Sequence, residues 1–64
     1  MIVNGVAHDS LSSPTVAELL NELGVVVRGV AVAINGEIVR RSLWEATRVQ
    51  PADRVEIVTA VAGG

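Results

Sequence analysis

The pattern of apolar and polar positions at the start of the chain predicts a β-hairpin. Met1–Val3 is apolar and ends at Asn4-Gly5, a dipeptide typical of two-residue hairpin turns because both residues tolerate positive φ. Val6–Asp9 is expected to be the returning strand. A polar loop, Ser10–Pro14, then separates this hairpin from the next element.

A short amphipathic helix is predicted over Thr15–Leu23. Its apolar residues recur at the spacing of one helical face, and they are Val16, Leu19, Leu20 and Leu23. Thr15 and Glu18 have the spacing of a capping box, in which each side chain bonds a backbone N–H of the first turn. Gly24 is expected to end the helix, since glycine adopts the left-handed conformation at little cost. A helix this short needs a sheet to lie against.

The second half of the chain predicts a second hairpin and a long final strand. In Val30–Ile34 the larger aliphatic side chains fall on one face and two alanines on the other. Asn35-Gly36 repeats the hairpin dipeptide, and Glu37–Val39 is expected to return from it. After a polar stretch, Arg54–Ala60 alternates as the last strand.

This order of elements predicts an α+β fold, in which one main helix packs on a four- or five-stranded mixed sheet. A hairpin, a crossover helix and a late long strand favour the β-grasp arrangement, with the first and last strands side by side in parallel. We expect one domain over residues 1–60. Residues 61–64 are expected to form a flexible C-terminal tail, because glycines gain little from packing.

Composition narrows the classes of function. The chain has 64 residues, 50% of them hydrophobic, and Trp44 is the one aromatic residue, expected as a satellite of the core. A domain of this size buries only ~60% of its unfolded surface, which argues against a large active-site cleft. The lack of cysteine excludes disulfides, thiolate catalysis and cysteine-based zinc sites.

Charge and hydropathy exclude two further kinds of partner. A net charge of −2 and a single aromatic residue argue against nucleic-acid binding, which needs a basic face or stacking platforms. No apolar run approaches the ~20 residues of a membrane span, and the start of the chain has no signal-peptide pattern. We therefore expect a cytoplasmic protein with no membrane partner.

Residues suited to catalysis or metal binding are few. His8 is the only histidine, and the adjacent Asp9 would point to the opposite face of a strand, so a solvated hairpin histidine is the simpler interpretation. Three serines have no general base at a useful spacing, namely Ser10, Ser12 and Ser13. Arg40 and Arg41 could grip an anionic partner, although two charges on a solvated loop explain them more simply. We predict no catalytic residue and no metal site.

The final residues, Gly63 and Gly64, directly follow a well-patterned strand. Because they lack Cβ atoms they can enter a narrow channel of a partner, and the four residues of the tail extend by at most ~14 Å. The reactive group there would be the α-carboxylate of Gly64. A carboxylate becomes electrophilic once adenylation by ATP provides AMP as a leaving group, and a sulfur nucleophile can then leave a thiocarboxylate. Because nothing in the chain could catalyse these steps, the tail predicts a substrate carried between enzymes.

These residues resemble the ThiS family, the sulfur carriers of thiamine biosynthesis. The similarity is most specific in residues 30–42 and 53–64, and it extends to Asn4-Gly5 and Thr15–Leu20, so that it covers nearly the whole chain. The resemblance implies a ubiquitin-like β-grasp. It also implies a protein co-substrate, with no enzymatic activity and no bound cofactor of its own.

The resemblance further implies the partners. A ThiF-type adenylating enzyme would use ATP and Mg to adenylate Gly64, and a cysteine desulfurase or other persulfide donor would supply sulfur for the thiocarboxylate. A ThiG-type thiazole synthase would then receive the sulfur. Gly63 would be the required small neighbour of Gly64. The other residues expected to dock partners are Val58, Ala60, Val61 and Ala62.

The sequence departs from the family pattern at two positions, and three other functions are considered beside the sulfur carrier of thiamine biosynthesis. Arg40 stands where the family often has proline, and Ala52 where it usually has glycine, but neither position belongs to the tail. The small subunit of molybdopterin synthase resembles the same fold and tail, although it is usually longer and contains aromatic segments that are missing here. A β-grasp binding module that carries no sulfur would tolerate deletion of the tail. A metal-dependent or hydrolytic enzyme is disfavoured by the missing ligands and nucleophile.

Overall fold

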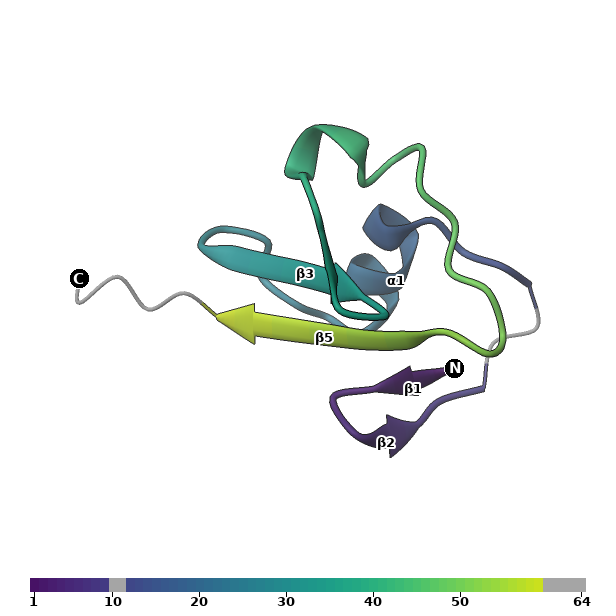
Figure 1. The fold of residues 1–64 in the computed structure, drawn as a ribbon. Helices are drawn as coiled ribbons and strands as arrows, with labels where there is room; N and C mark the ends of the chain where they lie inside the picture. The colour runs from purple at the N-terminus through teal and green to yellow at the C-terminus, as the bar shows by residue number, and fades with distance from the viewer. Residues whose placement is uncertain (10–11, 60–64) are drawn as a thin grey trace.

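The computed structural model of the chain describes residues 1–9 and 12–59. Within these residues, a mixed sheet of five strands carries one α-helix against one of its faces (Figure 1). The strands are β1 (Ile2–Val3), β2 (Val6–Ala7), β3 (Val30–Ile34), β4 (Glu37–Val39) and β5 (Arg54–Thr59). The helix is α1 (Val16–Glu22), and a 3₁₀ turn, η1 (Arg41–Leu43), follows β4.

Strand β5 lies at the centre of the sheet, whose order is β2-β1-β5-β3-β4. It pairs in parallel with β1, where Val3 lies opposite Val55. On its other side it pairs antiparallel with β3, where Val32 lies opposite Ile57. The parallel pairing of the first and last strands confirms the predicted β-grasp.

Both predicted hairpin turns are present. All four of their central residues have positive φ, with values of 50° at Asn4, 81° at Gly5, 51° at Asn35 and 86° at Gly36. Positive φ at both central positions defines the turn type whose twist matches that of paired strands. The two dipeptides therefore fix the register of β1 with β2 and of β3 with β4.

The returning strand of the first hairpin is shorter than the predicted Val6–Asp9. β2 ends at Ala7, so that His8 and Asp9 lie beyond it. β1 pairs with β2 through Ile2 and Val3, so β2 is as short as its partner. His8 still continues the hairpin, because its N–H donates to the Met1 carbonyl at 2.9 Å and its carbonyl accepts from the Met1 ammonium group at 3.2 Å.

The helix begins and ends where its signals indicate. The Thr15 hydroxyl accepts from the Glu18 N–H at 3.1 Å, and the Glu18 carboxylate accepts from the Thr15 N–H at 2.8 Å, which completes the predicted capping box. Leu23 is the C-cap, and Gly24 follows with a φ of 71°. With seven residues, the one α-helix in the described part of the chain is too short to cross a membrane.

The hydrophobic core lies between α1 and the sheet. Its buried members among the described residues are Val16, Leu19, Leu20, Val32, Trp44, Val49 and Val55. The helix supplies the three residues of its predicted apolar stripe that are fully buried, and β3 and β5 supply one valine each. The alternation of β3 places Val32 in this core and the alanines on the opposite face of the sheet.

Trp44 is part of the main core, not a satellite of it as predicted. It is 5% exposed, and its ring Nε1–H donates to the Val39 carbonyl at 2.9 Å. The turn η1 brings the chain back over α1, where the Ala17 N–H donates to the Trp44 carbonyl at 3.1 Å. The sequence around Trp44 is polar, so only this tertiary contact reveals its position.

Candidate functional site

The predicted tail and docking residues fall mostly beyond the part of the chain that the structure describes. Those outside the described residues are Ala60, Val61, Ala62, Gly63 and Gly64. The last strand was predicted to reach Ala60, and its described part ends at Thr59. The domain boundary at residue 60, the flexibility of residues 61–64 and the role of Gly64 therefore stay predictions.

Val58, the remaining predicted docking residue, lies in β5 on the face of the sheet opposite α1. Its side chain is 59% exposed, and it borders a shallow hollow of about 120 Å³. The hollow is also bordered by Ala31, Ala33 and Ile38, and by Val32 and the charged Glu56. We call its four outward-facing apolar residues, Ala31, Ala33, Ile38 and Val58, the open-face patch. Ile38 is 74% exposed, so two large aliphatic side chains of the patch reach solvent.

The strand register assembles the open-face patch from three strands. Ala31 lies opposite Val58, and Ala33 lies opposite both Ile38 and Glu56. The small alanines form the floor between the two larger side chains, which leaves the hollow. An exposed apolar surface of this kind is typical of sites that bind a protein partner.

Sequence reasoning found Val58 but missed the other three residues of the patch. The alternation of β3 does place its alanines away from the core, and this signal was visible in Val30–Ile34. The position of Ile38 beside them depends on the pairing of β3 with β4, and the position of Val58 on the pairing of β3 with β5. Long-range register of this kind is not encoded in local spacing.

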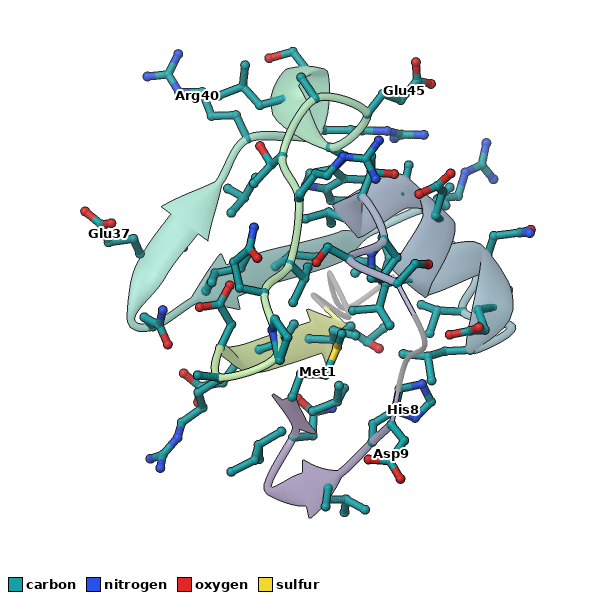
Figure 2. The ribbon with its side chains drawn as sticks, turned by 90° about the vertical axis from the view of Figure 1, so that its right-hand side faces the viewer. Met1, His8, Asp9, Glu37, Arg40 and Glu45 are labelled. Atoms are coloured by element: carbon teal, nitrogen blue, oxygen red, sulfur yellow. The ribbon has the colours of Figure 1, made fainter. Side chains whose placement is uncertain are left out.

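Ionisable side chains do not converge on one site. Figure 2 shows His8 and Asp9 at one end of the molecule and Arg40 and Glu45 at the other. In the described part of the chain, no three histidine, aspartate or glutamate side chains are grouped so that they could hold a metal ion.

The His8 side chain contacts the last residue of helix α1. Its Nε2 lies 3.3 Å from the Glu22 carboxylate, and its side chain is 30% exposed, so it is less solvated than expected. The contact links the segment after β2 to the end of α1. Asp9 takes no part in it, in agreement with the expectation that the two neighbours do not share a site.

The two adjacent arginines behave differently. The Arg41 guanidinium carbon lies 5.8 Å from the centre of the Trp44 ring, within range of a cation–π contact. Arg40 extends from the end of the molecule (Figure 2). Both residues are exposed, and Arg41 at least has an intramolecular role.

Comparisons with known proteins agree with this geometry. A family model described as the ThiS family matches residues 1–64. The sulfur carrier protein ThiS of Escherichia coli (strain K12) is 36% identical over 64 residues, which is all of this chain and 97% of that protein. A thiazole synthase of Paramagnetospirillum magneticum is 42% identical over 64 residues, and the chain spans only 20% of that protein's length.

Solved structures show the same fold. The crystal structure of the thiamine biosynthesis protein ThiS from Geobacter metallireducens matches with a TM-score of 0.82 and 38% identity, over 98% of this chain and 96% of that one. An NMR structure of a thiamine biosynthesis protein from the same organism matches with a TM-score of 0.78, also at 38% identity, over 98% and 85% of the two chains. Together with the family match over residues 1–64, these relatives show that the chain belongs to the ThiS family of thiamine-biosynthesis sulfur carriers.

Proposed function

We propose that this chain carries sulfur for thiazole formation as a thiocarboxylate on Gly64. The observation that carries the proposal is the full-length match to the ThiS family and to the sulfur carrier of E. coli, in a sequence with Gly63-Gly64 after its last strand. The same matches support a co-substrate of partner enzymes, because the E. coli relative is named a sulfur carrier protein.

The proposed chemistry begins at the α-carboxylate of Gly64. One carboxylate oxygen attacks the α-phosphorus of ATP, and pyrophosphate leaves, which gives an acyl adenylate. The terminal sulfur of a persulfide then attacks the acyl carbon and expels AMP. A thiol cleaves the resulting acyl disulfide and frees the thiocarboxylate. The ATP and Mg belong to the adenylating enzyme, and this chain supplies only the carboxylate.

Three partners are part of the proposal. They are a ThiF-type adenylating enzyme, a cysteine desulfurase or other persulfide donor, and a ThiG-type thiazole synthase. The last is supported by the thiazole synthase of P. magneticum, since a segment 42% identical to this chain makes up a fifth of that protein. Docking would use the open-face patch, with the residues after Val58 leading to the partner's catalytic site.

Intact-protein mass spectrometry tests the proposal. The chain is incubated with Mg-ATP, an adenylating enzyme and a persulfide donor, beside a variant that lacks Gly64. We expect a mass shift that corresponds to one oxygen replaced by sulfur, and we expect it only in the full-length chain. E. coli ThiS serves as the positive control that shows the enzymes to be active. No shift under these conditions would contradict the carrier role and favour a binding module.

The recipient is tested separately. The thiocarboxylated chain is offered to a thiazole synthase and, in parallel, to the large subunit of a molybdopterin synthase. Loss of sulfur from the carrier only with thiazole synthase is the expected result. Transfer only to the molybdopterin enzyme would keep the carrier chemistry and contradict the proposed pathway.

A further inference from the structure

The side chain of Asn4 bonds to the backbone of β5 at Ile57. Its Oδ1 accepts from the Ile57 N–H at 2.7 Å, and its Nδ2–H₂ donates to the Ile57 carbonyl at 3.2 Å. The backbone N–H of Asn4 donates to the Val55 carbonyl at 2.9 Å. A carboxamide offers the same donor and acceptor as a peptide group, so the Asn4 side chain takes the place of one.

This replacement extends the parallel pairing beyond the end of β1. The pairs between β1 and β5 end with Val3 opposite Val55, and the chain then turns at Asn4 with a φ of 50°. The Asn4 side chain reaches two residues further along β5, to Ile57. On this flank of β5, the Asn4 side chain therefore makes the hydrogen bonds to Ile57 that the backbone of a longer β1 would make.

The other flank of β5 is held by β3 up to its last described pair. Val58 lies opposite Ala31, and Thr59 lies opposite Val30, the first residue of β3. The last described pair of β5 is therefore also the first pair of β3, and residues at the limit of a ladder open most easily. Among the described residues, Asn4 makes the hydrogen bonds on the opposite flank that lie nearest in sequence to this pair.

A second Asn-Gly turn bonds the opposite end of β5 and provides a comparison. Asn35 has the same φ within a degree, and its Oδ1 accepts from the Arg54 N–H at 3.0 Å. Its Nδ2 donates to the Asp53 carboxylate at 3.0 Å. Asn35 therefore holds the start of β5 as Asn4 holds its end, with the same residue type in the same backbone conformation.

We propose that Asn4 is a positioning residue for sulfur loading. By fixing Ile57, it sets the direction in which β5 presents Val58 and the residues that lead to Gly64. The inference rests on the proposed carrier function. If the adenylating enzyme binds only chains in which the end of β5 is aligned, opening of that end reduces the fraction of chains that it can bind. The apparent affinity of the enzyme for the carrier then falls in proportion to this fraction. Once the complex has formed, the partner itself holds the tail, so the rate of the bound step is unaffected.

Adenylation kinetics test this role with a matched pair of variants. Asn4→Gly removes the two side-chain bonds and keeps a residue that accepts positive φ, and Asn35→Gly makes the same change at the far end of β5. For Asn4→Gly we expect the KM for the carrier to rise, by at most about fivefold, which is the factor equivalent to one typical hydrogen bond, with kcat unchanged. For Asn35→Gly we expect both constants to match the unchanged chain. An equal rise of KM in both variants, or no rise in Asn4→Gly, would overturn the proposal.

An NMR measurement that needs no enzyme separates this inference from the proposed function. Backbone order parameters of Val58 and Thr59 are expected to fall in Asn4→Gly and to stay unchanged in Asn35→Gly, with faster exchange of the Ile57 amide only in the former. Unchanged order in Asn4→Gly would overturn the positioning role even if loading were impaired. If the unchanged chain were not adenylated while E. coli ThiS was, the carrier function would fail and the NMR result would still decide whether Asn4 holds the strand end.

A less disruptive substitution at Asn4 is available if Asn4→Gly does not fold. Asn4→Asp then replaces it. Aspartate tolerates positive φ and keeps an acceptor for the backbone N–H, but it loses the amide donor. Asn35→Gly stays as the control, because an aspartate at position 35 would face the Asp53 carboxylate. The same difference between the two sites is expected, in the same direction, and equal behaviour of Asn4→Asp and Asn35→Gly would overturn the proposal.

Discussion

Single residues organise this chain mainly through side-chain hydrogen bonds to the backbone. Thr15 caps the helix, and Asn4 and Asn35 hold the two ends of β5. The contact between His8 and Glu22 is partly exposed, and such surface pairs contribute only ~0–1 kcal/mol. In the described residues, no polar side-chain atom is buried without a partner, so the few polar groups inside the fold are all used to fix backbone.

Gly64 is where a single-residue change should affect chemistry without affecting the fold. Gly64→Ala adds one methyl group beside the carboxylate that the adenylating enzyme must align, and small misplacements at a reacting group can lower rates ~100-fold. We expect loading with sulfur to fall by about that factor. Intact-mass assays over a time course measure the loading.

The control for this variant is the fold itself. Thermal unfolding of Gly64→Ala is expected to match that of the unchanged chain, because one methyl group in the predicted flexible tail should change stability little. Loading at the original rate would contradict the steric argument for glycine at this position.

At the level of elements, the helix depends on its cap and its packing. α1 has seven residues, well below the ~12–15 at which isolated helices become marginally stable in water. Three of its side chains are fully buried against the sheet, and the capping box satisfies two backbone N–H groups of its first turn. The helix is therefore stable only as part of the fold, and its first turn is the place to measure what local structure contributes.

Thr15→Ala should lower the free energy of unfolding by ~1 kcal/mol, since the Glu18 N–H loses its acceptor when the hydroxyl is removed. Urea unfolding followed by circular dichroism measures the change. Ser13→Ala is the matched control, because Ser13 makes only a long, exposed side-chain bond of 3.4 Å to Gln50. Equal stability of the two variants would show that the capping box contributes nothing to the fold.

Elements with local signals were predicted well, and features that depend on distant pairing were not. The Asn-Gly turns, the capping box and Gly24 all act within a few residues, and each is present as expected. The length of β2 depends on how much of β1 pairs with it, and the burial of Trp44 depends on η1 folding over α1. Neither the length of β2 nor the burial of Trp44 can be predicted from the spacing of residues in the sequence.

The same distinction holds for the candidate site. The alternation of β5 predicts that Val58 faces away from the core, and it does, whereas Ile38 lies beside it only through the register of β3 with β4 and β5. The docking role of Val58 stays a prediction. The side-chain bonds from Asn4 to Ile57 span 53 positions in the sequence. The turn that contains Asn4 was predictable from the sequence, but the hydrogen bonds from the Asn4 side chain to β5 were not.

At the scale of the whole molecule, the two faces of the sheet differ. α1 and the segment that contains Trp44 cover one face, and the other carries the open-face patch of Ala31, Ala33, Ile38 and Val58. The open-face patch therefore offers exposed apolar surface next to the central strand β5, and the proposed docking of partners would use this surface.

A charge placed on the bare face should weaken partner binding without loss of folding. Val58→Lys puts an ammonium group into the open-face patch, and burying it against an apolar partner surface is unfavourable even with the Glu56 carboxylate on the same face. We expect the Kd for the adenylating enzyme, measured by isothermal titration calorimetry, to rise at least about tenfold, as for a residue central to an interface. Val26→Lys is the matched control, because Val26 is 76% exposed and does not border the hollow.

Both variants should unfold within ~0.5 kcal/mol of the unchanged chain, since exposed substitutions away from the core change stability little. Equal stability of the two variants means that any difference in their Kd comes from the substituted surface and not from a difference in the fraction of folded protein. If Val58→Lys bound as tightly as Val26→Lys, the open-face patch would not be the docking surface, and recognition would have to come from the tail alone. If both bound weakly, the connector that contains Val26 would also belong to the interface, which would then extend around the edge of the sheet.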